Sequence, residues 1–377
     1  MTAPVENGIK MGEGRVHPYF DLETHYDSAA WSNTPKGTTN TQIFGEVVNH
    51  FRPGFRLDLP ATAVDMSLNA NVDYVWYTGL LNAQDTQASR LEAGADLAAN
   101  FNKNGPVGFE VGDRFSRSDR TSNAAIAIGV ISLFNEIRAG IPIKPGGGAL
   151  ELDPTVGYAV EFFSPIAGNT PLQDPKTFNY QNVRFGLGGR YRFLPKTAIV
   201  LDASYDLRSY FSAGNLPAQL LKAETGLAGL VSPKIALLLK LGWAQDFAGR
   251  ARSLIGHGEL NYFLNERSNV KFGYLRSIDP VPLFGSFGDD RGYVEANLMM
   301  AEKLRMQGYA AFDYLTYYGV ARHDTSVTFS LSPEYTLTRW FKLGAAYTLS
   351  VRSSDQVTSA TLNFTRHEGL LRATFQY

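Results

Sequence analysis

Residues 62–77 read TAVDMSLNANVDYVWY, and their side chains alternate between apolar and polar at almost every step. The apolar positions include Val64, Val72 and Trp76, and the polar positions include Asp65 and Asp73. Successive side chains of a strand point to opposite faces of its sheet, so this stretch predicts a long strand with one apolar and one hydrated face. The pattern returns many times along the chain, and the size and aromatic ends of the apolar face indicate that this face contacts lipid.

Composition restricts the kind of membrane span that the chain can form. The chain has 377 residues, is 44% hydrophobic and contains no cysteine. Its mean hydropathy is -0.17, and no apolar run approaches the roughly 18 residues of a transmembrane helix. Any membrane span must therefore be a β-strand. The lack of cysteine suits a bacterial outer-membrane barrel, which crosses an oxidising periplasm before it folds, although a cysteine-free cytosolic protein shares this feature.

The net charge of the chain and the sequence of its first residues indicate which partners and which cellular location to expect. The 35 basic and 36 acidic residues give a net charge of -1, whereas nucleic-acid-binding proteins usually carry a basic excess, so we expect no nucleic-acid partner. Residues 1–14, MTAPVENGIKMGEG, lack the basic and apolar regions of a secretory signal peptide. We expect an outer-membrane protein whose signal has been removed, with residues 1–14 in the periplasm and residues 15–377 forming a single barrel.

The recurrence of period-two alternation predicts the fold class. It indicates an all-β protein, a transmembrane up-and-down antiparallel β-barrel of about 18 strands with both ends of the chain on the periplasmic side. The predicted strands span residues 15–27, 50–58, 62–77, 87–102, 106–117, 121–135, 149–162, 178–194, 197–210, 218–231, 234–246, 253–265, 269–278, 291–301, 303–316, 324–337, 340–352 and 362–377.

The predicted connections alternate in length, as they do in porin-type barrels with short periplasmic turns and longer external loops. Short turns with Pro, Gly or polar residues fall at 104–106, 194–196, 232–234, 265–268 and 337–339, and longer links at 28–49, 163–177, 279–290 and 353–361. Two links break this scheme. Residues 135–148, NEIRAGIPIKPGGG, are too long for a periplasmic turn, so they form either a periplasmic loop or part of longer strands. The third external link, at 118–120, is very short.

Aromatic residues recur at the predicted strand ends, where an apolar ring with a polar tip suits the headgroup boundary of a membrane. An ordinary packing role is equally open for each residue taken alone. The predicted outer girdle contains Trp76, Tyr77, Tyr210, Phe211, Tyr317 and Tyr318, and the inner girdle contains Phe101, Phe193, Trp340, Phe341 and Tyr377.

Several stretches resemble the β-barrel porin 2 family over nearly the whole chain. They are GIKMGEGRVHPYFDLETHYDSAA (8–30), NVRFGLGGRYRFLPKTAIVLDASYDLRSYF (182–211), GLAGLVSPKIALLLKLGWAQDF (226–247) and NERSNVKFGYLRSID (265–279). The resemblance implies an outer-membrane barrel of the kind encoded with exopolysaccharide synthesis systems, which lets a polysaccharide cross the outer membrane beside a periplasmic export protein.

The last residues, ATFQY, resemble the signal that the barrel-assembly machinery recognises, with Phe375 and Tyr377 as its aromatic residues. Arg372 stands where this signal usually has Gly, which is a departure from the pattern.

The polar face of the predicted strands carries charged residues of both signs. A barrel of this size leaves an aqueous channel, and a mixture of signs argues against a filter for small ions of one charge, which needs a ring of like charge. A neutral or variably charged polymer fits this wall better, although paired charges that only stiffen the wall are the alternative for each residue. The predicted pore-lining residues are Arg114, Arg184, Arg190, Arg192, Asp202, Asp206, Arg208, Lys222, Glu224, Lys240, Glu259, Lys271 and Asp313.

No catalytic, cofactor or metal site is predicted. The six histidines are scattered, and none lies in a zinc-hydrolase or serine-hydrolase motif. His25 near Asp27, and His323 beside Asp324, do not form a constellation by spacing alone. Asp289 and Asp290, in the predicted 279–290 loop, are a weak signal for calcium, and we interpret them as solvated loop charges.

Three functions therefore compete. The first is an outer-membrane conduit for a secreted polysaccharide. The second is a structural or docking barrel, closed by its loops, that anchors an envelope-spanning secretion or surface-motility complex. The third is a general diffusion porin, against which the short 118–120 link counts, because such a porin usually folds a long third loop into its pore.

Overall fold

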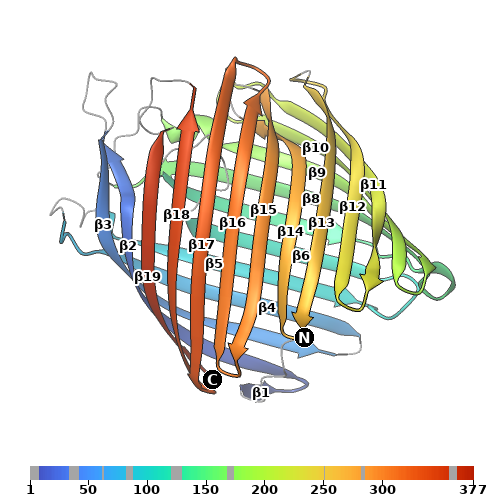
Figure 1. The fold of residues 1–377 in the computed structure, drawn as a ribbon, viewed down its shortest axis with the longest axis horizontal. Helices are drawn as coiled ribbons and strands as arrows, with labels where there is room; N and C mark the ends of the chain where they lie inside the picture. The colour runs from blue at the N-terminus through green and yellow to red at the C-terminus, as the bar shows by residue number, and fades with distance from the viewer. Residues whose placement is uncertain are drawn as a thin grey trace.

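The computed structural model describes residues 8–33, 42–61, 63–81, 88–119, 130–167, 174–249, 251–281, 285–355 and 363–377. Within these residues the chain forms one antiparallel sheet that closes on itself. Eighteen strands, β2 to β19, build the barrel, each paired with the next along the chain, and β19 pairs with β2 to complete the ring (Figure 1). The predicted fold class is confirmed. None of the helices in the described residues is long and apolar enough to cross a membrane.

The strands have lengths typical of membrane-spanning barrels. Two short 3-10 turns, η2 (Pro145–Gly147) and η3 (Pro175–Phe178), lie in the connections. The strands are β1 (Ile9–Met11), β2 (Gly14–Asn33), β3 (Gln42–Pro60), β4 (Val64–Tyr77), β5 (Arg90–Phe101), β6 (Phe109–Ser118), β7 (Val130–Gly140), β8 (Leu150–Pro165), β9 (Tyr180–Leu194), β10 (Thr197–Tyr210), β11 (Ala218–Ser232), β12 (Ile235–Asp246), β13 (Arg252–Asn265), β14 (Ser268–Val281), β15 (Gly285–Ala301), β16 (Leu304–Tyr317), β17 (Arg322–Thr338), β18 (Phe341–Ser354) and β19 (Phe364–Gln376).

The first barrel strand begins, and the last barrel strand ends, at the same rim of the barrel. β1 forms a short hairpin with the start of β2, where Ile9 lies opposite Val16. The backbone N–H of Tyr377 donates to the carbonyl of Pro18 at 3.0 Å, so the last residue lies beside the first barrel strand, at the lower rim in Figure 1. We name this the turn rim, because most of the two-residue connections lie there, and the opposite one the loop rim.

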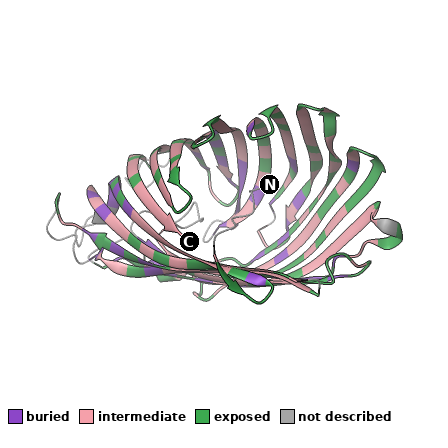
Figure 2. Ribbon diagram, turned by 90° about the horizontal axis from the view of Figure 1, so that it is seen from below, coloured by how far each residue is buried: buried purple, intermediate pink, exposed green. Residues whose placement is uncertain are grey.

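The two faces of the wall differ as the sequence predicts. On β4, Val72, Tyr74 and Trp76 are exposed on one face, and Asp73 is buried on the other. Exposed and less exposed residues alternate along most strands (Figure 2). Because apolar side chains cover the outside of the barrel, this outer face is suited to lipid.

Around β6 and β7 the structure differs from the predicted boundaries. The predicted strand at 121–135 overlaps β7, which spans Val130–Gly140; residues 121–129 of the prediction lie outside the described residues. The 135–148 stretch is therefore partly strand, because hydrogen bonds to β8 and β6 continue past Asn135. β6 ends at Ser118, and the predicted third external link at 118–120 runs into residues 120–129, which lie outside the described residues, so its predicted shortness gives no argument against a diffusion porin.

Two long predicted links are mostly strand. β2 continues to Asn33 and β3 begins at Gln42, which shortens the link predicted at 28–49. β14 and β15 extend through most of 279–290. Asp289 and Asp290 are therefore strand residues rather than loop charges.

The aromatic girdles are confirmed only in part. Trp76, Phe211 and Tyr318 are exposed near the loop rim. Tyr77 and Tyr317 are almost completely buried, because they lie on the inward face of their strands, one residue out of phase with the lipid-facing positions.

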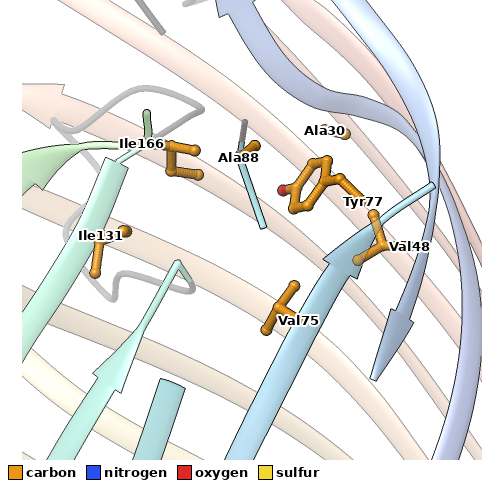
Figure 3. Packing of buried hydrophobic residues seen from close by; sticks show 7 residues of the cluster. All are labelled: Ala30, Val48, Val75, Tyr77, Ala88, Ile131 and Ile166. Atoms are coloured by element: carbon orange, nitrogen blue, oxygen red, sulfur yellow. The ribbon is translucent and has the colours of Figure 1, made fainter. Parts of the chain in front are cut away.

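Apolar packing inside the barrel gathers near the loop rim. One cluster joins Val48, Val75, Tyr77, Ile131 and Ile166 with two alanines, from β3 and β4 on one side and from β7 and the end of β8 on the other (Figure 3). Further clusters form at the ends of β9, β12 and β16. The barrel is therefore packed at this rim.

Candidate pore lining

A cavity of about 410 Å³ identifies the inward face of the wall. Its lining comes from β8, β9 and β10 and also from β14 to β18, which are separate parts of the ring, so the cavity lies inside the barrel. The lining residues are Glu161, Tyr180, Arg208, Leu275, Ser277, Asp279, Pro280, Phe287, Asp289, Arg291, Asp313, Leu315, Ser326 and Arg352.

The predicted pore-lining residues all lie on this face. Arg208 and Asp313 line the cavity itself. Asp202 and Asp206 precede Arg208 at alternate positions of β10, and their partners opposite are Glu224 on β11 and Arg184 on β9. The others follow from the same alternation and from the register of neighbouring strands.

Arginine and carboxylate groups are layered on the wall. Nε of Arg184 donates to Asp206 at 2.6 Å, and the Arg184 side chain is 50% exposed whereas that of Asp206 is 5% exposed. Arg372 covers Glu23 in the same way. The carboxylate sits against the wall and the guanidinium faces the lumen.

Two lysine pairs of the wall have the opposite arrangement. Lys240 binds Asp202 at 3.0 Å, and here the carboxylate is 54% exposed whereas the lysine is 17% exposed. Lys222 and Asp279 follow the same order. The lumen therefore presents groups of both signs.

The three predicted pore-lining arginines of β9 are Arg184, Arg190 and Arg192, and they do not all pair with the neighbouring strand β10. Only Arg184 joins a predicted acid of β10. Arg192 reaches back to Glu151 on β8 at 2.5 Å, and Asp202 is used by Lys240. Strand register explains this, since Asp202 lies opposite Gly188.

The hairpin of β14 and β15 leaves the wall near the loop rim. β14 pairs with β13 only as far as Arg276, opposite Gly256, but stays paired with β15 to Val281. Beyond Arg276 the hairpin leans inward, where Ile278 is fully buried with Leu220 and Ile255. The lumen narrows at this point.

Polar contacts hold this inward hairpin in place. Nζ of Lys222 on β11 donates to Asp279 at 2.9 Å. The hydroxyl of Ser286 donates to the buried carboxylate of Asp246 at 2.5 Å. Gly285, at the tip, has φ of +82°, which favours glycine.

The predicted pore-lining residues include none from β2, β3 or β4, although the alternation of β4 predicts its polar face. Asp27 pairs with Arg366, Glu23 with Arg372, and Asp73 with Arg52 at 2.7 Å. The signal was present in part, because 21, 23, 25 and 27 are polar residues at alternate positions and so share one face.

The comparisons with known proteins concern the whole barrel. No protein-family model and no curated protein sequence matches the chain. Among solved structures, Acinetobacter baumannii OccAB3 has a TM-score of 0.52 and 12% identity, with 96% of this chain and 99% of that chain covered. Acinetobacter baumannii OccAB4 has a TM-score of 0.50 and 13% identity over 100% of both chains.

A third solved structure, the siderophore receptor PirA from Pseudomonas aeruginosa, has a TM-score of 0.50 and 9% identity, and covers 96% of this chain and 80% of that chain. The likeness is one of fold. The architecture is that of bacterial outer-membrane barrels, and the resemblance to the β-barrel porin 2 family stays a prediction.

Proposed function

We propose that this protein is an outer-membrane channel through which a secreted polysaccharide leaves the cell. The observation that carries this proposal is the exposure of charged side chains inside the barrel. Asp96 and Arg114, half-way along β5 and β6, are 66% and 67% exposed although they face inward. A packed interior would bury such groups at a high cost in free energy. Their exposure supports a hydrated lumen.

The outer face supports the membrane location. Apolar residues such as Leu239 and Leu241 on β12, and Phe272 on β14, are exposed on the outside of the barrel. Contact with the hydrocarbon core of an outer membrane would remove them from water.

The character of the wall supports a polymer rather than a small ion. Many carboxylates and cations are paired along the described part of the wall, so the inward face there presents both signs rather than a ring of like charge. Tyr293 and Tyr309 add hydroxyl groups on the inward face, and the hydroxyl of Tyr293 donates to Glu259 at 2.9 Å. Such a surface offers a sugar chain many weak hydrogen bonds.

The proposed partners act at the turn rim. A periplasmic export protein would deliver the polymer there. The barrel-assembly machinery would recognise Phe375, which stacks on Phe341 with ring centroids 4.8 Å apart, and Tyr377, which is exposed.

The test is the conductance of the refolded protein in a planar bilayer, with and without a soluble polysaccharide. We expect steady current steps that the polymer blocks from one side. Current steps that no polymer affects would leave a channel but contradict its cargo. Silence from barrels whose folding is verified by heat-modifiable migration would contradict an open channel.

A docking barrel is the second candidate, and the inward hairpin together with the apolar clusters at the loop rim favours it. It predicts the silent outcome. A partner protein that restores current to such barrels would distinguish a closed channel from a scaffold.

The Lys222–Asp279 pair should control the position of the hairpin. We expect Asp279→Asn to raise the mean conductance. The ion pair between Lys222 and Asp279 is partly exposed and stabilises the inward position of the hairpin by up to about 1 kcal/mol. Its loss should therefore raise the population of an outward hairpin about fivefold. The matched control is Asp202→Asn, which removes the same charge from the lumen without touching the hairpin. Equal conductance in the two variants would contradict the claim that the Lys222–Asp279 pair holds the hairpin inward.

A further inference from the structure

A group of histidine and carboxylate side chains lies where the last strand meets the first. We name Glu23, His25 and Asp27 of β2, His50 of β3 and Glu368 of β19 the seam cluster. Its members share the inward face, because Glu23 lies opposite His50 and Asp27 lies opposite Glu368 in the strand register. Closure of the barrel therefore assembles the cluster from three strands.

The geometry of the seam cluster suits a metal ion. One ligand atom from each of Glu23, His25 and His50 lies within 4.8 Å of the other two. Zinc bonds to nitrogen and oxygen are about 2.0–2.2 Å long, so a tetrahedral ion holds its ligand atoms roughly 3.4 Å apart. Small side-chain rotations would close this difference. A second set, His25 with Asp27 and Glu368, meets the same limit.

His50 is held as metal-binding histidines usually are. Its Nδ1 lies 3.0 Å from Oδ2 of Asp73 on β4. A carboxylate on one ring nitrogen fixes the orientation of the imidazole and leaves Nε2 as the atom that can bind a metal. Arg52 also binds Asp73, which fixes the carboxylate in turn.

His25 provides an independent observation. It is only 5% exposed, and its Nε2 has no hydrogen-bond partner among the described residues. The nearest charged atom given for it is Oε1 of Glu368, at 3.4 Å. A buried polar nitrogen without a hydrogen bond costs free energy, which a bound cation would recover.

Charge around the cluster also favours a cation. The carboxylates Glu23, Asp27, Asp73 and Glu368 share three arginines, Arg52, Arg366 and Arg372. With neutral imidazoles the carboxylates are in excess. Arg372 contacts Glu23 through Oε2 at 2.7 Å, so the carboxylate is oriented without both oxygens being occupied by this arginine.

We propose that Glu23, His25 and His50 bind one Zn²⁺ ion per chain, with Asp73 positioning His50. Two imidazoles and one carboxylate are a ligand set that zinc takes in proteins. The ion would join β2 to β3 at the closing edge of the barrel. This inference is independent of what passes through the lumen.

The test is calorimetric titration of Zn²⁺ into the refolded full-length chain in detergent, after removal of metal with a chelator. We expect one site per chain, with affinity reduced at least tenfold in His25→Gln and in His50→Gln. Asp73→Asn should lose roughly 10-fold to 100-fold, as outer-shell carboxylates of metal sites do. The matched control is His323→Gln, since His323 lies on the outer face against Tyr314 and should not matter.

Folding of each variant is checked by heat-modifiable migration. If His25→Gln does not fold, the proposal is tested by the Zn²⁺ affinity of His50→Gln and by the visible absorption spectrum of Co²⁺ bound to the wild-type protein. Tetrahedral ligation of Co²⁺ by nitrogen and oxygen gives strong absorption bands. Absence of a stoichiometric site in the folded wild type, equal affinity in the His50→Gln variant, or equal loss in the control would overturn the proposal.

Discussion

Replacing Asp324 by asparagine should lower the free energy of unfolding by about 3–5 kcal/mol. Asp324 is completely buried on the inward face of β17. Its carboxylate accepts hydrogen bonds from Arg322 at 2.5 Å and from Arg352 at 2.7 Å. Removal of its charge leaves two poorly exposed guanidinium groups facing a neutral amide. The cost is therefore mostly that of burying two guanidinium groups that have lost their shared carboxylate.

Denaturant unfolding of the barrel in lipid vesicles measures this change, with the fluorescence of the four tryptophans as the signal. The control is Asp202→Asn, which should cost less than about 1 kcal/mol because its ion pair with Lys240 is half exposed. Similar costs for the two variants would mean that burial does not set the strength of these pairs.

Placing arginine at Leu239 should cost roughly 2–4 kcal/mol, the value expected for a charge near the midplane on the lipid face of a barrel. Leu239 is in the middle part of β12 and half exposed on the outside. Leu349, on the same face of β18, should behave alike.

The control for this prediction is Ala346→Arg. Ala346 lies opposite Leu370 on the inward face of β18 and β19, two strands that also carry lumen charges, so an arginine there can stay hydrated and its effect should be mild. The same vesicle experiment measures all three variants. A larger loss at Ala346 than at Leu239 would reverse the assignment of the two faces.

The sequence predicts the wall of the barrel better than its rims. Alternation over residues 62–77 is a local property, and it gives the correct face for Val72, Asp73 and Trp76. At the loop rim the prediction for Tyr77 is wrong. The predicted outer girdle contains it together with Trp76, but neighbouring residues of a strand face opposite sides, and Tyr77 is buried inside the barrel against Ile131 and Ile166 from distant strands.

The predicted site residues lie on the predicted face, but their partners could not be derived. A partner depends on register across strands, and register depends on turns such as that between β9 and β10, where the pairing shifts near Thr197. On the register that follows, Asp202 lies opposite Gly188, and it pairs with Lys240 of β12 rather than with an arginine of β9.

The seam cluster illustrates the same limit. His25 and Asp27 are two residues apart, which places them on one face, and that much was readable from the sequence. The position of His50 opposite Glu23, and of Glu368 opposite Asp27, follows only from the registers of β2 with β3 and of β19 with β2. The second of these is the longest-range pairing in the sheet.

Closure of β19 on β2 also has a consequence for the order of folding. Every other pair of barrel strands joins neighbours in the chain, whereas Arg366 and Asp27 are separated by 339 residues, and Arg372 and Glu23 by 349. Closing so long a loop has a high entropic cost, so these contacts should form last. Until then two strand edges with unpaired backbone groups remain open. The barrel therefore completes in a single final step, to which both ends of the molecule must contribute at once.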